Sequence, residues 1–191
     1  MSIPVLDAAG MLPPGRFLTT LDEVEDRFVA NATFGGSATR RTIWGGFLEY
    51  IGAWRAAEES TAAPGRALLG VWLAGSFISA KIDPSDLDCT PVLDVKVMEA
   101  TKGRPGHGDM KKLVRHRDGV RSMFHVEVFP YKWTPVRSSL FPATCSQSER
   151  DSLCARGALD AWWQRVRPPG PERAPEPSPP YPERGYLEVI L

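Results

Sequence analysis

Apolar residues recur along the chain with two different periods, which predict helices in some segments and strands in others. Between Arg40 and about Glu58, large apolar residues return every three or four positions, the period of a helix packed against a core. These residues are Ile43, Trp44, Phe47, Tyr50, Ile51 and Trp54. The segment is therefore predicted to be a long helix with one buried face.

Two shorter helices are predicted by the spacing of their capping residues. Thr20 is followed three residues later by Glu23, and Ser146 is followed at the same distance by Glu149. This is the spacing of a capping box, in which each side chain satisfies a backbone N–H at the start of a helix. We expect the first helix to run to about Ala30.

Three segments have the pattern of β-strands. The run from Ala67 to Ala74 is continuously apolar, as in a strand buried on both faces. The stretch from Leu87 to Met98 is rich in valine, and apolar and polar residues alternate from Met123 to Tyr131. Together with the helices they predict an α+β (two-layer) fold.

The length of 191 residues is enough for one domain with short appendages. Residues 1–18 include Pro13, Pro14 and Gly15 and are expected to form an extended arm, followed by the domain at 19–167. Eight prolines between residues 168 and 182 predict a stiff connector over 168–184. The final residues, 185–191, are expected to form a strand on the same domain.

The composition disfavours several classes of protein. Hydrophobic residues make up 42% and charged residues 24%, as in globular proteins, and no apolar run is long enough to span a membrane. The start lacks the pattern of a signal peptide, and the three cysteines form no paired motif, so we expect a cytoplasmic protein. A net charge of zero argues against coating of nucleic acid by bulk electrostatics.

The residues that suggest chemistry follow the buried strand at 67–74. The strand ends at Gly75 and Ser76, and Asp86 and Asp88 come shortly afterwards. In an extended chain these two carboxylates point to the same side, about 7 Å apart along the backbone. Such a pair calls for a cation, and hard oxygen ligands suit Mg²⁺ or Mn²⁺.

A nucleoside triphosphate would complete such a site. Gly75 permits close approach of the backbone to phosphate oxygens, Ser76 offers a hydroxyl, and Lys81 offers a positive charge. In-line phosphoryl transfer commonly uses a third carboxylate, for which we predict Glu127 on the strand at 123–131, with Asp94 as the alternative.

The segment from Lys102 to Arg121 is strongly basic. It holds seven lysines and arginines against two aspartates and joins the Asp86–Asp88 strand to the Glu127 strand. We expect it near the mouth of the site, where it would bind triphosphate or a polyanionic acceptor such as RNA.

At these residues the chain resembles the nucleotidyltransferase superfamily related to DNA polymerase beta. The matching pattern is Ala74-Gly75-Ser76, then Asp86-Leu87-Asp88, then the acid at 127, where many members have Asp in place of Glu. The strings LPPG, GSFISAKIDPSDLD and VEVFPY are similar to those of a little-characterised bacterial family of nucleotidyltransferase-like proteins. This narrower resemblance spans about Leu12 to Tyr131.

The resemblance implies a divalent-metal enzyme that transfers a nucleoside monophosphate from a triphosphate to an acceptor. The acceptor is open among RNA, protein, nucleotide and small molecule, and a toxin or defence role is implied by some members of the superfamily. The alternative is a non-catalytic nucleotide-binding or interaction module. In that alternative, the terminal strand would bind a partner by strand addition.

Overall fold

The computed structural model of the chain describes residues 3–137, 140–166 and 180–191. Its centre is a six-stranded mixed sheet in the order β1-β6-β2-β3-β4, with β5 also paired to β3. The strands are β1 (Gly15–Thr19), β2 (Leu68–Ala74), β3 (Leu87–Asp94), β4 (Val126–Val128), β5 (Tyr131–Trp133) and β6 (Gly185–Ile190). Strand β2 is antiparallel to β3 and β6, whereas β4 and β5 are parallel to β3.

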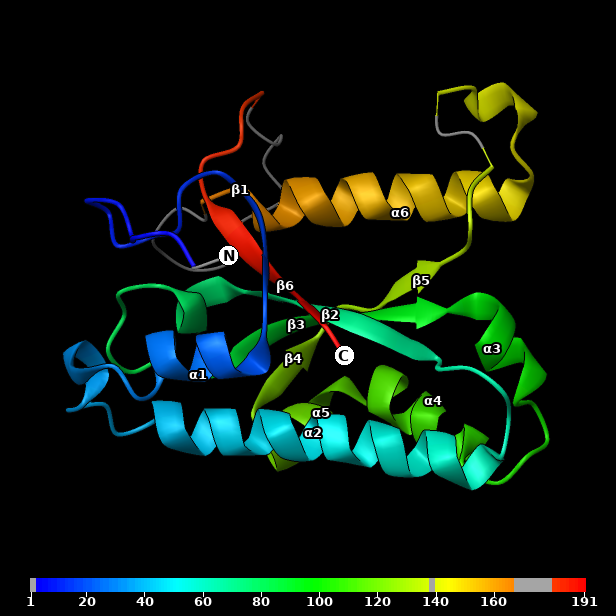
Figure 1. The fold of residues 1–191 in the computed structure, drawn as a ribbon, viewed down its shortest axis with the longest axis horizontal. Coiled ribbons are helices and arrows are strands. Elements are labelled where there is room, and N and C mark those ends of the chain that lie inside the picture. The colour runs from blue at the N-terminus through cyan, green and yellow to red at the C-terminus, as the bar shows by residue number, and fades with distance from the viewer. Residues whose placement is uncertain (1–2, 138–139, 167–179) are drawn as a thin grey trace.

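Helices cover both faces of this sheet (Figure 1). The α-helices are α1 (Leu21–Phe28), α2 (Arg40–Thr61), α3 (Val95–Ala100), α4 (His107–Arg115), α5 (Arg117–Phe124) and α6 (Gln147–Trp163). Helices α1, α2, α4 and α5 lie on one side, and α6 crosses the other. Short 3₁₀ helices occur at Ala32–Phe34 (η1), Gly75–Ile78 (η2) and Pro142–Thr144 (η3). The predicted α+β class is confirmed, and α6 adds helical cover on the second face.

Local sequence accounts for where several helices begin. Both capping boxes form, with Thr20 and Glu23 at the start of α1 and Ser146 and Glu149 at the start of α6. The apolar stripe of α2 is buried as predicted, and Trp54 is fully enclosed. The capping boxes and the apolar stripe could be predicted because each depends only on residues that are close together in the sequence.

Two predicted strands are shorter than expected. The strand predicted to reach Met98 ends at Asp94, because the Asp94 carboxylate accepts hydrogen bonds from the N–H groups of Lys96 and Val97 and thereby starts α3. The strand predicted over 123–131 begins only at Val126. Helix α5 extends to Phe124, and His125 ends it with a left-handed backbone (φ 56°).

The C-terminal strand lies inside the sheet. β6 pairs in parallel with β1 and in antiparallel with β2, so both of its edges are already hydrogen-bonded. The expectation that this strand adds to the sheet of a partner is therefore wrong. The segment expected to be an N-terminal arm contributes β1, and most of the predicted connector at 168–184 falls outside the described residues.

A buried arginine organises the loop that follows β2. Arg40 is only 1% exposed, and its guanidinium donates hydrogen bonds to five backbone carbonyls. The acceptors belong to Phe28, Phe77, Ser79, Lys81 and Ile82. Burial lowers the pKa of Arg40 to about 10, which leaves the group charged at neutral pH. The residue thus fixes most of the path between Gly75 and Asp86.

Arg40→Met should lower the free energy of unfolding by about 3 kcal/mol, because it leaves several buried carbonyls without a donor. Its neighbour Arg41 is exposed on the same helix. Arg41→Met should therefore change stability by no more than about 0.5 kcal/mol. Urea unfolding of the two variants tests this, and equal losses would show that the carbonyl contacts contribute little.

Candidate active site

The turn after β2 brings backbone and carboxylate into direct contact. Gly75 has a left-handed backbone (φ +73°), and a Cβ atom placed on it would lie 1.7 Å from Asp88 Oδ2. Only glycine fits both the conformation and the space. Ser76 follows in η2, and its carbonyl accepts hydrogen bonds from the backbone N–H and hydroxyl of Ser79. The Gly75–Ser76 turn and Asp88 therefore form one unit.

Three carboxylates gather where β2 ends and where β3 and β4 begin. Asp88 lies opposite Ala74 on β2 and opposite Glu127 on β4. Paired residues on neighbouring strands project to the same face, so Asp88 and Glu127 share one face of the sheet. Asp86 precedes β3 by one residue and is 7% exposed. The structure therefore places the three predicted acids next to the Gly75 turn.

The environment of Asp88 favours its protonated form. Burial, followed by the negative charges of Asp86 and Glu127, raises the pKa of Asp88 to about 7. The positive charges of Arg184 and Arg121 oppose this increase. Burial and the two neighbouring carboxylates together therefore outweigh the arginines in setting the pKa of Asp88.

Three arginines contact this cluster, of which Arg117 and Arg121 belong to the basic segment expected near the site and Arg184 was not predicted. Arg121 forms an ion pair with Asp86, and Arg117 pairs with Glu127 at 2.9 Å. They lie one turn apart on α5, a spacing that puts both on one side of the helix. Arg184, just before β6, donates a hydrogen bond of 2.8 Å to the carbonyl of Gly75.

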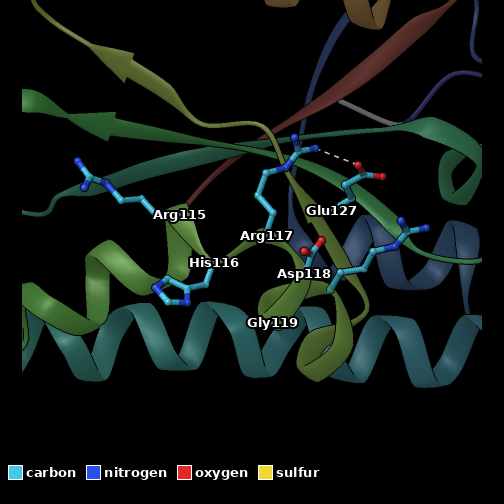
Figure 2. A pocket seen from close by; sticks show the side chains of 7 residues that line it. Arg115, His116, Arg117, Asp118, Gly119 and Glu127 are labelled. Atoms are coloured by element: carbon cyan, nitrogen blue, oxygen red, sulfur yellow. Dashed lines mark hydrogen bonds and ion pairs between the residues drawn. The ribbon is translucent and has the colours of Figure 1, made fainter.

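An open pocket of about 570 Å³ borders Glu127. Its wall follows the junction of α4 and α5 and consists of Arg115, His116, Arg117, Asp118 and Gly119, together with Arg121 and Glu127. Figure 2 shows Arg117 facing Glu127 across their ion pair, with Arg115 further away along the wall. The last part of the basic segment, residues 115–121, therefore lies beside Glu127 of the carboxylate cluster.

Two other predicted site residues are not part of the cluster. The side chain of Lys81 is exposed and, within the described ranges, makes no contact with the carboxylates. Asp94 lies six residues from Asp88 at the other end of β3, about 20 Å away at the usual rise per residue, and caps α3. Asp94 therefore cannot be the third acid.

The three carboxylates of the cluster are side chains of the type that binds a divalent cation. All three acids offer hard oxygen donors, and the pKa of Asp88 is raised first by burial and then by the charges of Asp86 and Glu127, the second of which a cation would relieve. Nevertheless, in the part of the chain that is described, no group of three His, Cys, Asp or Glu side chains is arranged to hold a metal ion. Asp86 and Glu127 are instead paired with arginines, so cation binding requires an exchange of partners.

Comparison with known proteins establishes the family. A model of a family of unknown function (DUF6932) matches residues 4–189, and the chain therefore belongs to this family. No curated protein and no solved structure matches the chain significantly. Among the described helices, none combines the length and the apolar character needed to span a membrane.

Gly75→Ala should destabilise the protein by about 2 kcal/mol or more, because the added methyl group meets both a left-handed backbone and the Asp88 carboxylate. Gly108 in α4 is a matched control, since a Cβ there meets no atom within 4 Å. Gly108→Ala should be neutral or slightly stabilising. Thermal unfolding measures both, and a neutral Gly75→Ala would contradict the contact with Asp88.

The pKa of Asp88 gives a pH dependence to stability. The folded-state pKa, about 7, lies above the ordinary value of 3.8, so the folded state binds the proton more tightly. The contribution of Asp88 is therefore fully present below about pH 4 and is lost as the pH rises through 7. Without divalent cations, Asp88→Asn should gain about 2 kcal/mol over wild type between pH 5 and pH 8.

Denaturant unfolding at several pH values measures this gain. Asp26→Asn serves as the control, because Asp26 is exposed on α1 and should show no such trend. Parallel stability curves for wild type and Asp88→Asn would contradict the electrostatic description of the cluster.

Proposed function

We propose that the protein is a divalent-cation-dependent nucleotidyltransferase, which transfers a nucleoside monophosphate from a triphosphate to an acceptor hydroxyl. One observation carries the proposal: Asp88 lies between the Gly75 turn on one side and Glu127 on the other. The turn that would bind phosphate and the carboxylates that would bind the cation are thus adjacent at one end of the sheet. The resemblance to the nucleotidyltransferase superfamily rests on the same residues.

The triphosphate would bind at the Gly75 turn. The Ser76 hydroxyl can donate a hydrogen bond to a phosphate, whereas the space directly beside the Gly75 Cα is taken by the Asp88 carboxylate. Arg184 supplies the positive charge expected from Lys81, since its guanidinium is already hydrogen-bonded to the Gly75 carbonyl. Its Nε is buried without a hydrogen-bond partner in the described chain, so it retains an unused donor.

Asp86, Asp88 and Glu127 would hold Mg²⁺ or Mn²⁺. When bound, the cation neutralises charge on the phosphates and on the leaving pyrophosphate. The acceptor oxygen forms a bond to the α-phosphorus while the bond between that phosphorus and the α–β bridging oxygen breaks. Glu127 borders the open pocket and is the carboxylate placed to take the proton from the acceptor hydroxyl.

A second candidate is supported by the arginine pairs. Because Arg121 forms an ion pair with Asp86 and Arg117 with Glu127, the negative charge of the cluster is partly neutralised by the protein itself. A non-catalytic nucleotide-binding module would retain such pairs permanently. The two candidates differ in whether the carboxylates exchange arginine for a cation when nucleotide is present.

The decisive assay incubates the protein with each labelled triphosphate, Mg²⁺ or Mn²⁺, and cell extract. Wild type should transfer label to an acceptor, and Asp86→Ala/Asp88→Ala should abolish the transfer. Glu127→Gln should lower the rate by about 100-fold or more, since it removes the proton acceptor. Asp94→Asn, on the same strand but outside the cluster, should stay within about threefold of wild type.

Thermal unfolding of each variant verifies that the loss of transfer does not reflect loss of folding. If no triphosphate yields label above the double variant with either cation, the proposed activity is wrong. If Asp94→Asn loses as much activity as Glu127→Gln, Glu127 does not have the role assigned to it.

A further inference from the structure

The pocket beside Glu127 has three arginines and two acids among its seven lining residues. Arg115, Arg117 and Arg121 line it together with His116, against the acids Asp118 and Glu127. Its volume of about 570 Å³ lies in the range of pockets that bind small molecules. The wall residues 115–119 are consecutive and connect α4 to α5, so their backbone positions are fixed by two helices.

The arginines retain donors that the ion pairs do not use. Arg117 and Arg121 are about half exposed, whereas their partners Glu127 and Asp86 are 30% and 10% exposed. A guanidinium has five N–H donors, and Arg117 gives one of them to Glu127. Arg115 forms no ion pair within the described ranges. The pocket therefore offers several unused donors to an anion.

This pocket lies on the opposite side of Asp88 from the Gly75 turn. The sheet order β2-β3-β4 places Gly75 beyond one edge of β3 and Glu127 beyond the other. If the triphosphate binds at Gly75 and Arg184, the pocket remains for the second substrate. Three guanidinium groups would repel a polycationic acceptor and attract an anionic one.

We propose that this pocket is the acceptor site and that it binds an acceptor carrying a phosphate group near its reacting hydroxyl. The inference rests on the proposed nucleotidyl transfer. The acceptor hydroxyl lies at Glu127, and its phosphate lies in the pocket lined by Arg115, Arg117 and Arg121, where it accepts hydrogen bonds from the arginines within its reach. In the reaction the hydroxyl oxygen bonds to the α-phosphorus, pyrophosphate leaves and Glu127 takes the proton. The acceptor's own phosphate is unchanged.

The same arginines couple acceptor binding to the cation. Before the cation binds, Arg117 and Arg121 are paired with Glu127 and Asp86. If Asp86 and Glu127 held a cation, Arg121 and Arg117 would be released from them and could pair with the phosphate of the acceptor. Cation and acceptor therefore bind with positive cooperativity, because each favours the same exchange of partners.

Equilibrium binding without any nucleoside triphosphate tests the site. The probes are adenosine 5′-monophosphate against adenosine, and a single-stranded RNA pentamer against a pentamer with an uncharged backbone. At least one phosphate-bearing probe should bind about tenfold more tightly than its neutral match. Tight binding of the mononucleotide indicates a free nucleotide as acceptor, whereas tight binding of the pentamer alone indicates an RNA chain.

Arg115→Ala should weaken binding of the phosphate-bearing probe about tenfold, and it leaves the two ion pairs of the cluster in place. Lys111→Ala is the matched control, because Lys111 lies one turn earlier on α4, is exposed and does not line the pocket. It should change the affinity less than twofold. Mg²⁺ should tighten binding about fivefold in wild type and not in Asp86→Asn/Asp88→Asn.

Equal affinity for charged and neutral probes, or an Arg115→Ala variant that binds like Lys111→Ala, would overturn the inference. If the binding experiments fail in this way but label transfer is observed, the acceptor pocket is wrong and the proposed activity is still supported. Phosphate-dependent binding without label transfer would instead support the pocket and contradict the activity. Absence of any effect of Mg²⁺ would refute the exchange of partners.

Discussion

The contact between the Asp88 carboxylate and the backbone of Gly75 is the constraint on which the site depends. It follows from the antiparallel pairing of β2 and β3, which sets Asp88 opposite Ala74. Strand β3 therefore places the Asp88 carboxylate at the point where the chain leaves the end of β2. Arg40 holds the loop beyond that turn through four carbonyl contacts and ties it to the end of α1 through a fifth, at Phe28.

The negative charges of the three carboxylates are balanced by nearby arginines. Asp86, Asp88 and Glu127 are offset by Arg121, Arg117 and Arg184, which come from α5 and from the residue before β6. The compensation is incomplete at Asp88, whose pKa remains raised to about 7. A cluster of this kind can exchange an internal cation for an external one, because the arginines of α5 are half exposed.

Local patterns predicted much of the fold. The capping boxes at Thr20 and Ser146, the apolar stripe of α2 and the buried run of β2 each depend on a few neighbouring residues. The Gly75–Ser76 turn and the pair Asp86 and Asp88 were also visible, because the two features occur together directly after a buried strand.

The remaining features depend on long-range pairing. Arg184 is separated from Gly75 by more than a hundred residues, and only the insertion of β6 between β1 and β2 brings it there. Asp94 belongs to the same apolar segment as Asp88, yet its carboxylate starts a helix, which periodicity did not indicate. The partners of Arg117 and Arg121 became evident only when α5 was placed against β3 and β4.

The most direct test of a cation site at these carboxylates is a titration of Mn²⁺ followed by electron paramagnetic resonance, with a non-hydrolysable triphosphate analogue present. Wild type and Asp94→Asn should bind the ion with equal affinity. Asp88→Asn and Glu127→Gln should bind it at least about tenfold more weakly. Equal affinity in all four proteins would contradict the assignment of Asp88 and Glu127 as ligands.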